Sequence, residues 1–282
     1  MPSPTTHILI VLCLLTSVLS SPIPNPQTSE NAISQSTYSL STAQTFALSP
    51  SQRTALSARS AKSLINSLIA ATIMAPIINT KVAALSDSLN KFSQGIATVL
   101  SVDTTVSASA CSEMMVIFAR GTTEPGNVGL FAGPAFFKAL EEEMGAGTLG
   151  VQGVEYGASI EGFLKGGDPI GSTAMAALVT DTIQKCPNSK IVLSGYSQGA
   201  QLCHNAATSL PAATMAKVNS VVIFGDPNNG KPVANVDAAK TLVICHKLDN
   251  ICAGGDLVLV DHLTYSIDAK KAAAFVASRA KL

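Results

Sequence analysis

Charged residues are scarce in this chain of 282 residues: they make up 13% of it, against a share of about 25% in ordinary soluble domains. Lys and Arg together number 18, as do Asp and Glu, so the formal net charge is zero. Because basic residues do not outnumber acidic ones, the composition argues against a nucleic-acid-binding protein. With 47% hydrophobic residues, the sequence is also too apolar for wholesale disorder.

The sequence also lacks an apolar run of the about 20 residues that a transmembrane helix needs. The run 8–19 has only 12 residues and is followed by small residues, a pattern typical of a secretory signal peptide, although no Lys or Arg precedes it. We predict a signal peptide over 1–20 that is cleaved after Ser20, and a secreted, extracellular protein. An uncleaved anchor or a buried strand is the alternative. The run 64–78 is interrupted by polar residues and a proline, so we expect no integral membrane association.

No Asn-x-Ser/Thr sequon occurs, so N-glycosylation is not expected. Residues 21–53 are rich in Ser, Thr, Pro, Gln and Asn, which is typical of an extended segment that could carry O-glycans. Within the region 54–110, apolar residues of 54–100 recur every three or four positions, and we predict two amphipathic helices there, interrupted at Pro76. This region is predicted to be a non-catalytic helical extension or pro-region. The sequence does not distinguish a packed appendage from a pro-region or a surface-binding element.

From Cys111 onward, strand-like and helix-like segments alternate. The predicted strands are 114–119, 149–154, 190–196, 218–225 and 241–245, and the predicted helices are 133–144, 171–185, 198–209 and 265–282. Such alternation predicts an α/β domain over 111–282, with a mostly parallel sheet covered by helices on both faces.

The strongest motif for chemistry is G-x-S-x-G at Gly195-Tyr196-Ser197-Gln198-Gly199, between a predicted strand and a predicted helix. Glycines let the backbone make the sharp turn that exposes a serine hydroxyl at the carboxyl end of a sheet. The start of the following helix offers free N–H groups where an oxyanion would form. We predict that Ser197 is a nucleophile.

A serine nucleophile needs a base and an acid, and few residues qualify. In α/β-hydrolases the order along the chain is Ser, acid, His, which favours His262 over His246 and over His204 in the helix after the serine. Among the acids we prefer Asp249, because it lies in a loop between two cysteines that could fix it against the imidazole. Asp226 is the second choice.

The cysteines fit a secreted protein. Six occur, and loss of Cys13 with the signal peptide leaves an odd number, so at least one is free or joins two chains. Cys245 and Cys252 lie seven positions apart and could close a short loop. Cys203 lies in a helical pattern and is interpreted as a buried free thiol.

Four segments together resemble the fungal cutinases: residues 119–127 (ARGTTEPGN), the block 195–199, the Cys245…Asp249…Cys252 loop, and Asp261-His262-Leu263. The resemblance spans 111–282 and leaves 21–110 uncovered. It implies an α/β-hydrolase-like three-layer sandwich and a serine esterase.

The resemblance also implies roles for particular residues. It implies a triad of Ser197, Asp249 and His262, and an oxyanion hole formed by the backbone N–H groups of Thr122 and Gln198. It implies disulfides that join the pairs Cys111–Cys186 and Cys245–Cys252, which leaves Cys203 free. One departure is Thr122, where the best-known cutinases carry Ser; its hydroxyl is retained, but its β-branch restricts χ1.

Cutinases resemble lipases without a lid, so the resemblance implies a nucleophile that is open to a polymer surface. We expect Tyr196, Leu164, Leu257 and Val258 to contact substrate, with 163–170 and 257–260 as an apolar rim; for 257–260 a buried strand is the alternative. The expected substrate is cutin or a similar insoluble aliphatic polyester, with short-chain esters as surrogates. We expect a monomer that needs no cofactor or metal.

Two other functions remain open. An acetylxylan esterase, or another small-ester esterase of the same superfamily, would prefer acetylated sugar to polyester. A non-catalytic surface-binding protein on a hydrolase scaffold would not need the serine. The presence of Ser197, Asp249 and His262 argues against the non-catalytic protein.

Overall fold

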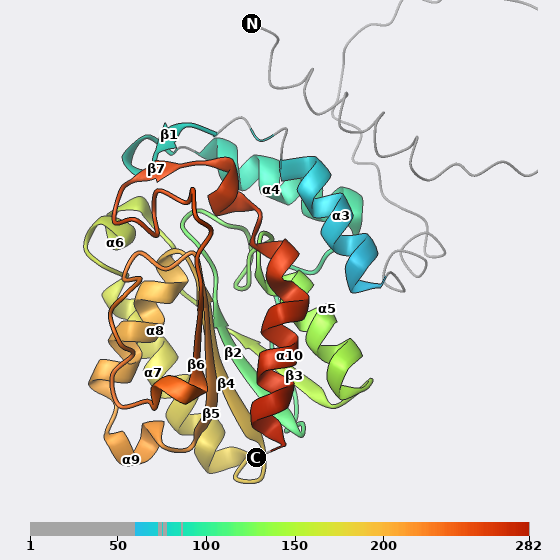
Figure 1. Cartoon of the computed structure of the whole chain (residues 1–282), viewed down its shortest axis with the longest axis vertical. Helices are drawn as coiled ribbons and strands as arrows, with labels where there is room; N and C mark the ends of the chain where they lie inside the picture. The colour runs from blue at the N-terminus through green and yellow to red at the C-terminus, as the bar shows by residue number, and fades with distance from the viewer. Residues whose placement is uncertain (1–59, 73–74, 76–77, 86, 282) are drawn as a thin grey trace, which may run out of the picture. The chain divides into compact units, whose positions relative to one another are not determined.

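A computed structural model describes residues 60–72, 75, 78–85 and 87–281 of the chain (Figure 1). The predicted signal peptide and the Ser/Thr-rich segment lie outside the described residues, so both stay predictions.

The centre of the molecule is a parallel sheet of five strands in the order β3-β2-β4-β5-β6. The strands are β2 (Met114–Ala119), β3 (Leu149–Gly153), β4 (Lys190–Tyr196), β5 (Val218–Phe224) and β6 (Thr241–Ile244). All six residues of β2 and the last six of β4 are buried. Strands covered on both faces are apolar on both faces, which is why these segments were visible as continuous hydrophobic runs.

Helices cover both faces of the sheet (Figure 1). α7 (Pro169–Lys185) and α8 (Gln198–Ser209) lie against one face, and α5 (Gly133–Met144) and α10 (Ala269–Ala280) lie against the other. The buried side of α10 consists mostly of alanines, which lets this helix pack closely on α5. The predicted three-layer α/β sandwich is confirmed.

Short elements complete the domain: α6 (Ile160–Leu164), α9 (Ala212–Met215) and the 3₁₀ turns η2 (Ala238–Lys240), η3 (Val260–Leu263) and η4 (Tyr265–Asp268). The last helix was predicted to begin at 265, but α10 begins at 269 after η4. The 3₁₀ turn directs Tyr265 into the core, where it is fully buried.

The described residues between 60 and 110 pack on the domain. It contains α3 (Ala61–Thr72), β1 (Thr80–Lys81), the turn η1 (Val82–Ala84) and α4 (Asp87–Leu100). α3 packs on α5, and β1 pairs antiparallel with β7 (Leu257–Val258). Within the described ranges, no helix is both long enough and apolar enough to cross a membrane.

Two disulfides join the cysteine pairs that the resemblance implies. Cys111–Cys186 lies where β2 and β4 begin, and Cys245–Cys252 closes a loop just after β6 ends. Cys203 is a free, buried thiol on α8. The two bridges therefore lie at opposite ends of the parallel sheet.

Candidate active site

Ser197 occupies a strained turn between β4 and α8. Its φ of 55° and ψ of −117° lie in a region that residues with a side chain rarely adopt. Close approaches explain the flanking glycines: a Cβ on Gly195 would lie 2.2 Å from the carbonyl oxygen of Gly199, and one on Gly199 would lie 2.0 Å from that of Ala119. The turn therefore raises Ser197 at the carboxyl ends of β4 and β2, where the strand order reverses and a crevice forms.

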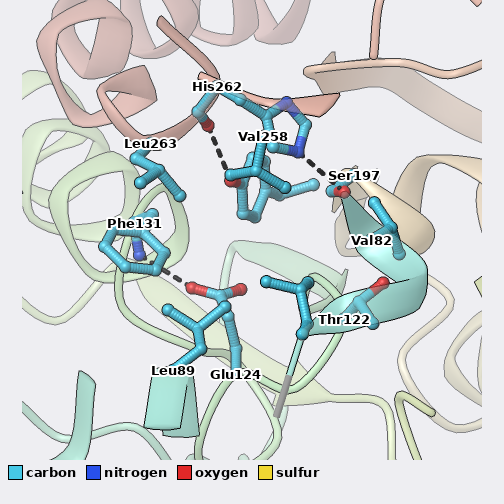
Figure 2. A pocket seen from close by; sticks show the side chains of 11 residues that line it. Val82, Leu89, Thr122, Glu124, Phe131, Ser197, Val258, His262 and Leu263 are labelled. Atoms are coloured by element: carbon cyan, nitrogen blue, oxygen red, sulfur yellow. Dashed lines mark hydrogen bonds between the residues drawn. The ribbon is translucent and has the colours of Figure 1, made fainter. Parts of the chain in front are cut away.

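Ser197, His262 and Asp249 form one chain of hydrogen bonds. The Ser197 hydroxyl lies 2.9 Å from Nε2 of His262 (Figure 2), and Nδ1 of the same ring lies 2.8 Å from Oδ2 of Asp249. All three side chains are buried. The geometry is that of a nucleophile, a base and an acid that orients the base.

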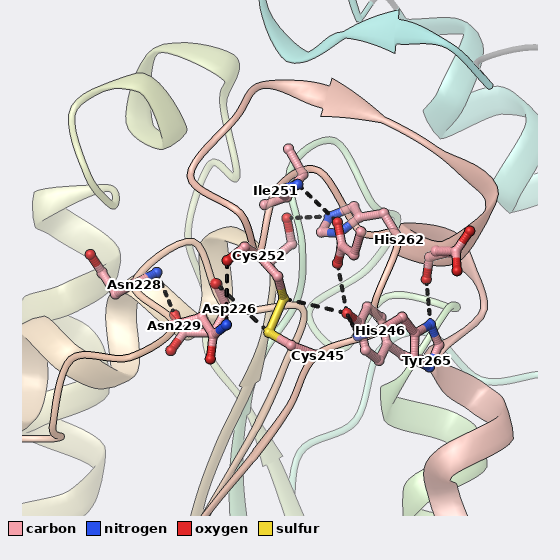
Figure 3. The surroundings of a disulfide bond; sticks show 12 residues. Asp226, Asn228, Asn229, Cys245, His246, Ile251, Cys252, His262 and Tyr265 are labelled. Carbon is pink, nitrogen blue, oxygen red and sulfur yellow. Dashed lines mark hydrogen bonds and ion pairs between the residues drawn. A yellow bond between two sulfur atoms is a disulfide. The ribbon is translucent and has the colours of Figure 1, made fainter.

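The Asp249 carboxylate receives further hydrogen bonds. The Ile251 N–H donates to Oδ1, and the Tyr265 hydroxyl donates to Oδ2 over 2.6 Å. Burial by itself would raise the pKa of Asp249, but the His262, Tyr265 and Ile251 donors together lower it below its ordinary value. Figure 3 shows the donors Ile251, His262 and Tyr265 near the Cys245–Cys252 bridge, which closes the loop that carries Asp249. The buried Asp249 side chain is therefore kept ionised.

The alternative base and acid pair with other partners. Nε2 of His204 lies 2.9 Å from the fully buried carboxylate of Asp226, and Nε2 of His246 lies 2.6 Å from Asp268. The structure brings neither His204 nor His246 to Ser197. Asp226 also accepts the Asn228 N–H, which fixes a turn after β5.

The N–H groups of Thr122 and Gln198 lack an acceptor anywhere in the described part of the chain. Thr122 follows β2, and Gln198 is the first residue of α8. The Gln198 side chain joins the two segments, because its Nε2 donates to Thr122 Oγ1 over 2.9 Å and to the Ser159 carbonyl over 2.8 Å. Two free donors beside a serine hydroxyl can bind a developing oxyanion.

Glu124 organises the loop after β2 and was missed by the sequence reasoning. Its buried carboxylate accepts the N–H groups of Gly121, Leu130 and Phe131 over 2.7 to 2.9 Å. Burial raises its pKa, although these three donors and Arg120 act in the opposite direction. The residue lies inside the 119–127 segment, but no local pattern distinguishes an acid that binds its own loop from a solvated one.

Residues of the N-terminal region cover Ser197. Val82, Leu85 and Leu89 line one small cavity together with Ser197 and His262 (Figure 2). The cavity volume is about 20 Å³, which is room for about one water molecule. The implied open nucleophile is therefore wrong for this structure, in which Val82, Leu85 and Leu89 lie over the hydroxyl.

The residues expected to contact substrate differ in position. Tyr196 and Val258 line the cavity, and the Tyr196 hydroxyl donates to the His262 carbonyl over 2.6 Å. Leu164 is 57% exposed at the end of α6, and Leu257 is half-buried in β7; neither lines the cavity. Of the segment 257–260, only Leu257 and Val258 form a strand, which pairs with β1, and only Val258 is buried, so the buried-strand alternative holds in part.

Comparison with known proteins identifies the family of this chain. The cutinase family model matches residues 110–280, which is more than half of the chain. The chain belongs to the cutinase family. It is accordingly a carboxylic ester hydrolase, and the resemblance drawn from the sequence is confirmed.

Individual cutinases are similar over most of their length. Cutinase pbc1 of Pyrenopeziza brassicae is 68% identical over 201 residues, which cover 71% of this chain and 99% of that protein. Cutinase cut1 of Trichoderma harzianum is 45% identical, with 76% and 96% covered. The structure of Trichoderma reesei cutinase in complex with a C11Y4 phosphonate inhibitor has a TM-score of 0.67 and 43% identity. The match covers 96% of that chain and 81% of this one. This share is larger than residues 110–282 alone make up, so the similarity extends into the region before residue 110.

Proposed function

We propose that this protein is a secreted cutinase that hydrolyses the ester bonds of cutin or similar aliphatic polyesters, and of short-chain esters. Ser197 is the nucleophile, His262 the general base and Asp249 the acid that orients it. The observation that carries this proposal is the hydrogen-bond chain from Ser197 Oγ through His262 to Asp249. The two disulfides support secretion, because disulfides persist in oxidising compartments.

In the proposed reaction, Nε2 of His262 takes the proton of Ser197 as Oγ attacks the ester carbonyl. The tetrahedral intermediate collapses when the imidazolium donates that proton to the departing alkoxide, which leaves an acyl-enzyme on Ser197. Water then attacks the acyl carbon, with His262 again taking the proton, and the carboxylic acid departs. Asp249 keeps the Nδ1–H tautomer throughout and stabilises the imidazolium.

Thr122 and Gln198 are proposed to hold the oxyanion through their backbone N–H groups. Such a donor contributes about 3–4 kcal/mol to the transition state where it has been measured. Since Thr122 Oγ1 accepts from Gln198 Nε2, its own proton is available as a further donor. The same contact fixes χ1 of the threonine.

The surroundings of Ser197 favour an apolar substrate. A ligand pocket for a small molecule typically has about 300–1,000 Å³, so the segment 78–100 must move before an ester can reach Ser197. Movement would expose Val82, Leu85 and Leu89, which are otherwise buried. Leu164 and Ile170 are already exposed near α6, which packs against η1. An apolar polymer would contact both groups of side chains.

A fluorophosphonate probe, which phosphonylates activated serines, tests the nucleophile. We expect one label per chain at Ser197, with no label and no esterase activity in Ser197→Ala. Full activity in Ser197→Ala would reject the mechanism. For the acid, we expect Asp249→Asn to lose most of its activity and Asp226→Asn, the matched control, to retain it; the reverse result would reassign the acid.

Rates on cutin, tributyrin and acetylxylan test the substrate. We expect hydrolysis of cutin and tributyrin to exceed that of acetylxylan. A preference for acetylxylan would make the protein a small-ester esterase with the same catalytic residues.

A further inference from the structure

His246 lies beside the candidate active site without contacting Ser197. It follows Cys245, and its ring stacks on that of Tyr265, with ring centres 4.2 Å apart and an interplanar angle of 16°. Nδ1 lies 2.7 Å from the carbonyl oxygen of Asp261, and Nε2 lies 2.6 Å from Oδ2 of Asp268. Both contacts reach the segment 260–268, which also carries His262.

The two contacts define the protonation state of the ring. A carbonyl oxygen only accepts, so Nδ1 must donate its hydrogen to Asp261. In a neutral ring Nε2 would then be a bare acceptor facing a carboxylate oxygen. A proton between Nε2 and Asp268 removes that repulsion and turns the contact into a charge-assisted hydrogen bond. His246 is therefore an imidazolium in this arrangement.

His246 also connects to the acid of the proposed triad. Its backbone N–H donates to the Tyr265 hydroxyl over 3.0 Å, and that hydroxyl donates to Asp249 Oδ2, the oxygen that receives His262 Nδ1–H. The His246 ring thus holds the Asp261 carbonyl next to His262, and its backbone N–H holds the Tyr265 phenol that donates to Asp249.

We propose that His246, as an imidazolium paired with Asp268, is a positioning residue for both His262 and Asp249. This inference rests on the proposed function, since it assigns these two residues to catalysis. When His246 loses its proton, its charged hydrogen bond to Asp268 is lost, and the 260–268 segment keeps only the contacts to Nδ1 and to the backbone N–H of His246. Catalysis then falls although His262 is in its neutral, basic form.

The direction of the pH effect follows from the groups that face His246. These are Asp268 and Tyr265 on η4 and Asp261 on η3. Burial lowers the pKa of His246, but the Asp268 hydrogen bond, the Asp261 carbonyl and the charges of the two carboxylates outweigh it and raise the pKa above the ordinary value of about 6.5. The hydrogen bond between His246 and Asp268 is complete below pH 6.5 and is lost as the pH rises through the raised pKa of His246.

The test is the dependence of kcat and KM on pH between 5 and 9, measured with a soluble short-chain ester. For the native sequence we expect kcat to fall at the alkaline end with a midpoint above pH 6.5. In Asp268→Asn the fall should move to lower pH while KM changes less than about twofold. In His246→Gln the alkaline fall should vanish, with kcat lowered about tenfold through looser positioning.

Asp181→Asn is the matched control, because Asp181 is an exposed carboxylate that pairs with Lys185 on α7. Its profile should equal that of the native sequence. The proposal would be overturned if kcat of the native sequence did not fall at alkaline pH, or if the midpoint of that fall were the same in Asp268→Asn.

NMR titration of the His246 ring, assigned by its loss in His246→Gln, separates the remaining outcomes. We expect the pKa of His246 to fall in Asp268→Asn. If that pKa falls and the kcat profile does not move, His246 has only a structural role. If Ser197→Ala is inactive in the same assay, the proposed mechanism stands even where the His246 proposal fails.

Discussion

Leu89→Ala should open the cover over Ser197. Leu89 lies on α4, is almost fully buried, and lines the cavity that contains the Ser197 hydroxyl. In an open form this side chain would be exposed, so its burial favours the closed form. Alanine keeps the helix propensity of α4 while it removes most of that apolar surface.

The magnitude follows from the buried side chain. Burial of a leucine contributes about 1.5–3 kcal/mol, so we take a loss of about 2 kcal/mol from the closed form in Leu89→Ala. Since 1.4 kcal/mol is a factor of ten in an equilibrium constant, the ratio of open to closed molecules should rise about 30-fold. If only open molecules react, kcat/KM on a soluble ester should rise by up to the same factor.

Two rates measure this effect: the second-order rate of fluorophosphonate labelling of Ser197, and kcat/KM on a short-chain ester below its solubility limit. Both should rise in Leu89→Ala. Leu210→Ala is the matched control, because Leu210 is buried at the end of α8 and does not line the cavity. Unchanged rates in Leu89→Ala, or equal rises in both variants, would refute the reasoning.

The other predictions concern the disulfides and the turn at Ser197. Removal of Cys111–Cys186, which closes a loop with a sequence separation of 75, should cost about 4–5 kcal/mol of unfolding free energy, and removal of Cys245–Cys252, with a separation of 7, only about 2–3 kcal/mol. In steady-state assays of the folded variants, loss of Cys245–Cys252 should lower activity more than loss of Cys111–Cys186, because only the shorter loop carries the proposed acid. Equal losses of activity in the two variants would contradict this. Gly195→Ala should lower kcat about 100-fold, since its Cβ would lie 2.2 Å from a backbone oxygen and displace the serine. Near-native kcat in that variant would show that the turn tolerates the side chain.

The parallel sheet was predictable because its strands are buried on both faces. β2 and β4 have the predicted ends, and β3, β5 and β6 each end one residue earlier. The strained turn at Ser197 was also visible, because close backbone approach restricts two of its positions to glycine. In both cases the cause lies within a few residues of the signal.

The choice among acids and bases depended on contacts that local sequence does not encode. His204 was a possible base by residue type, and Asp226 a possible acid by type and order, yet they pair with each other. The choice of Asp249 stays a prediction about catalysis, supported by its hydrogen bond to His262. The role of His246 depends on Asp268, which is 22 residues away and carries no motif.

The sequence by itself determined the α/β class and the strained serine, because burial on both faces and steric limits on a turn act locally; the cutinase family followed from the resemblance of four short segments. Tertiary structure alone decided what covers the serine. Apolar spacing in 54–110 predicts helices with one buried side, but the same spacing suits any apolar surface. The pairing of β1 with β7 joins strands about 177 residues apart and places Val82 over Ser197. Contacts at that separation depend on the folded shape of both partners, which neither segment specifies alone.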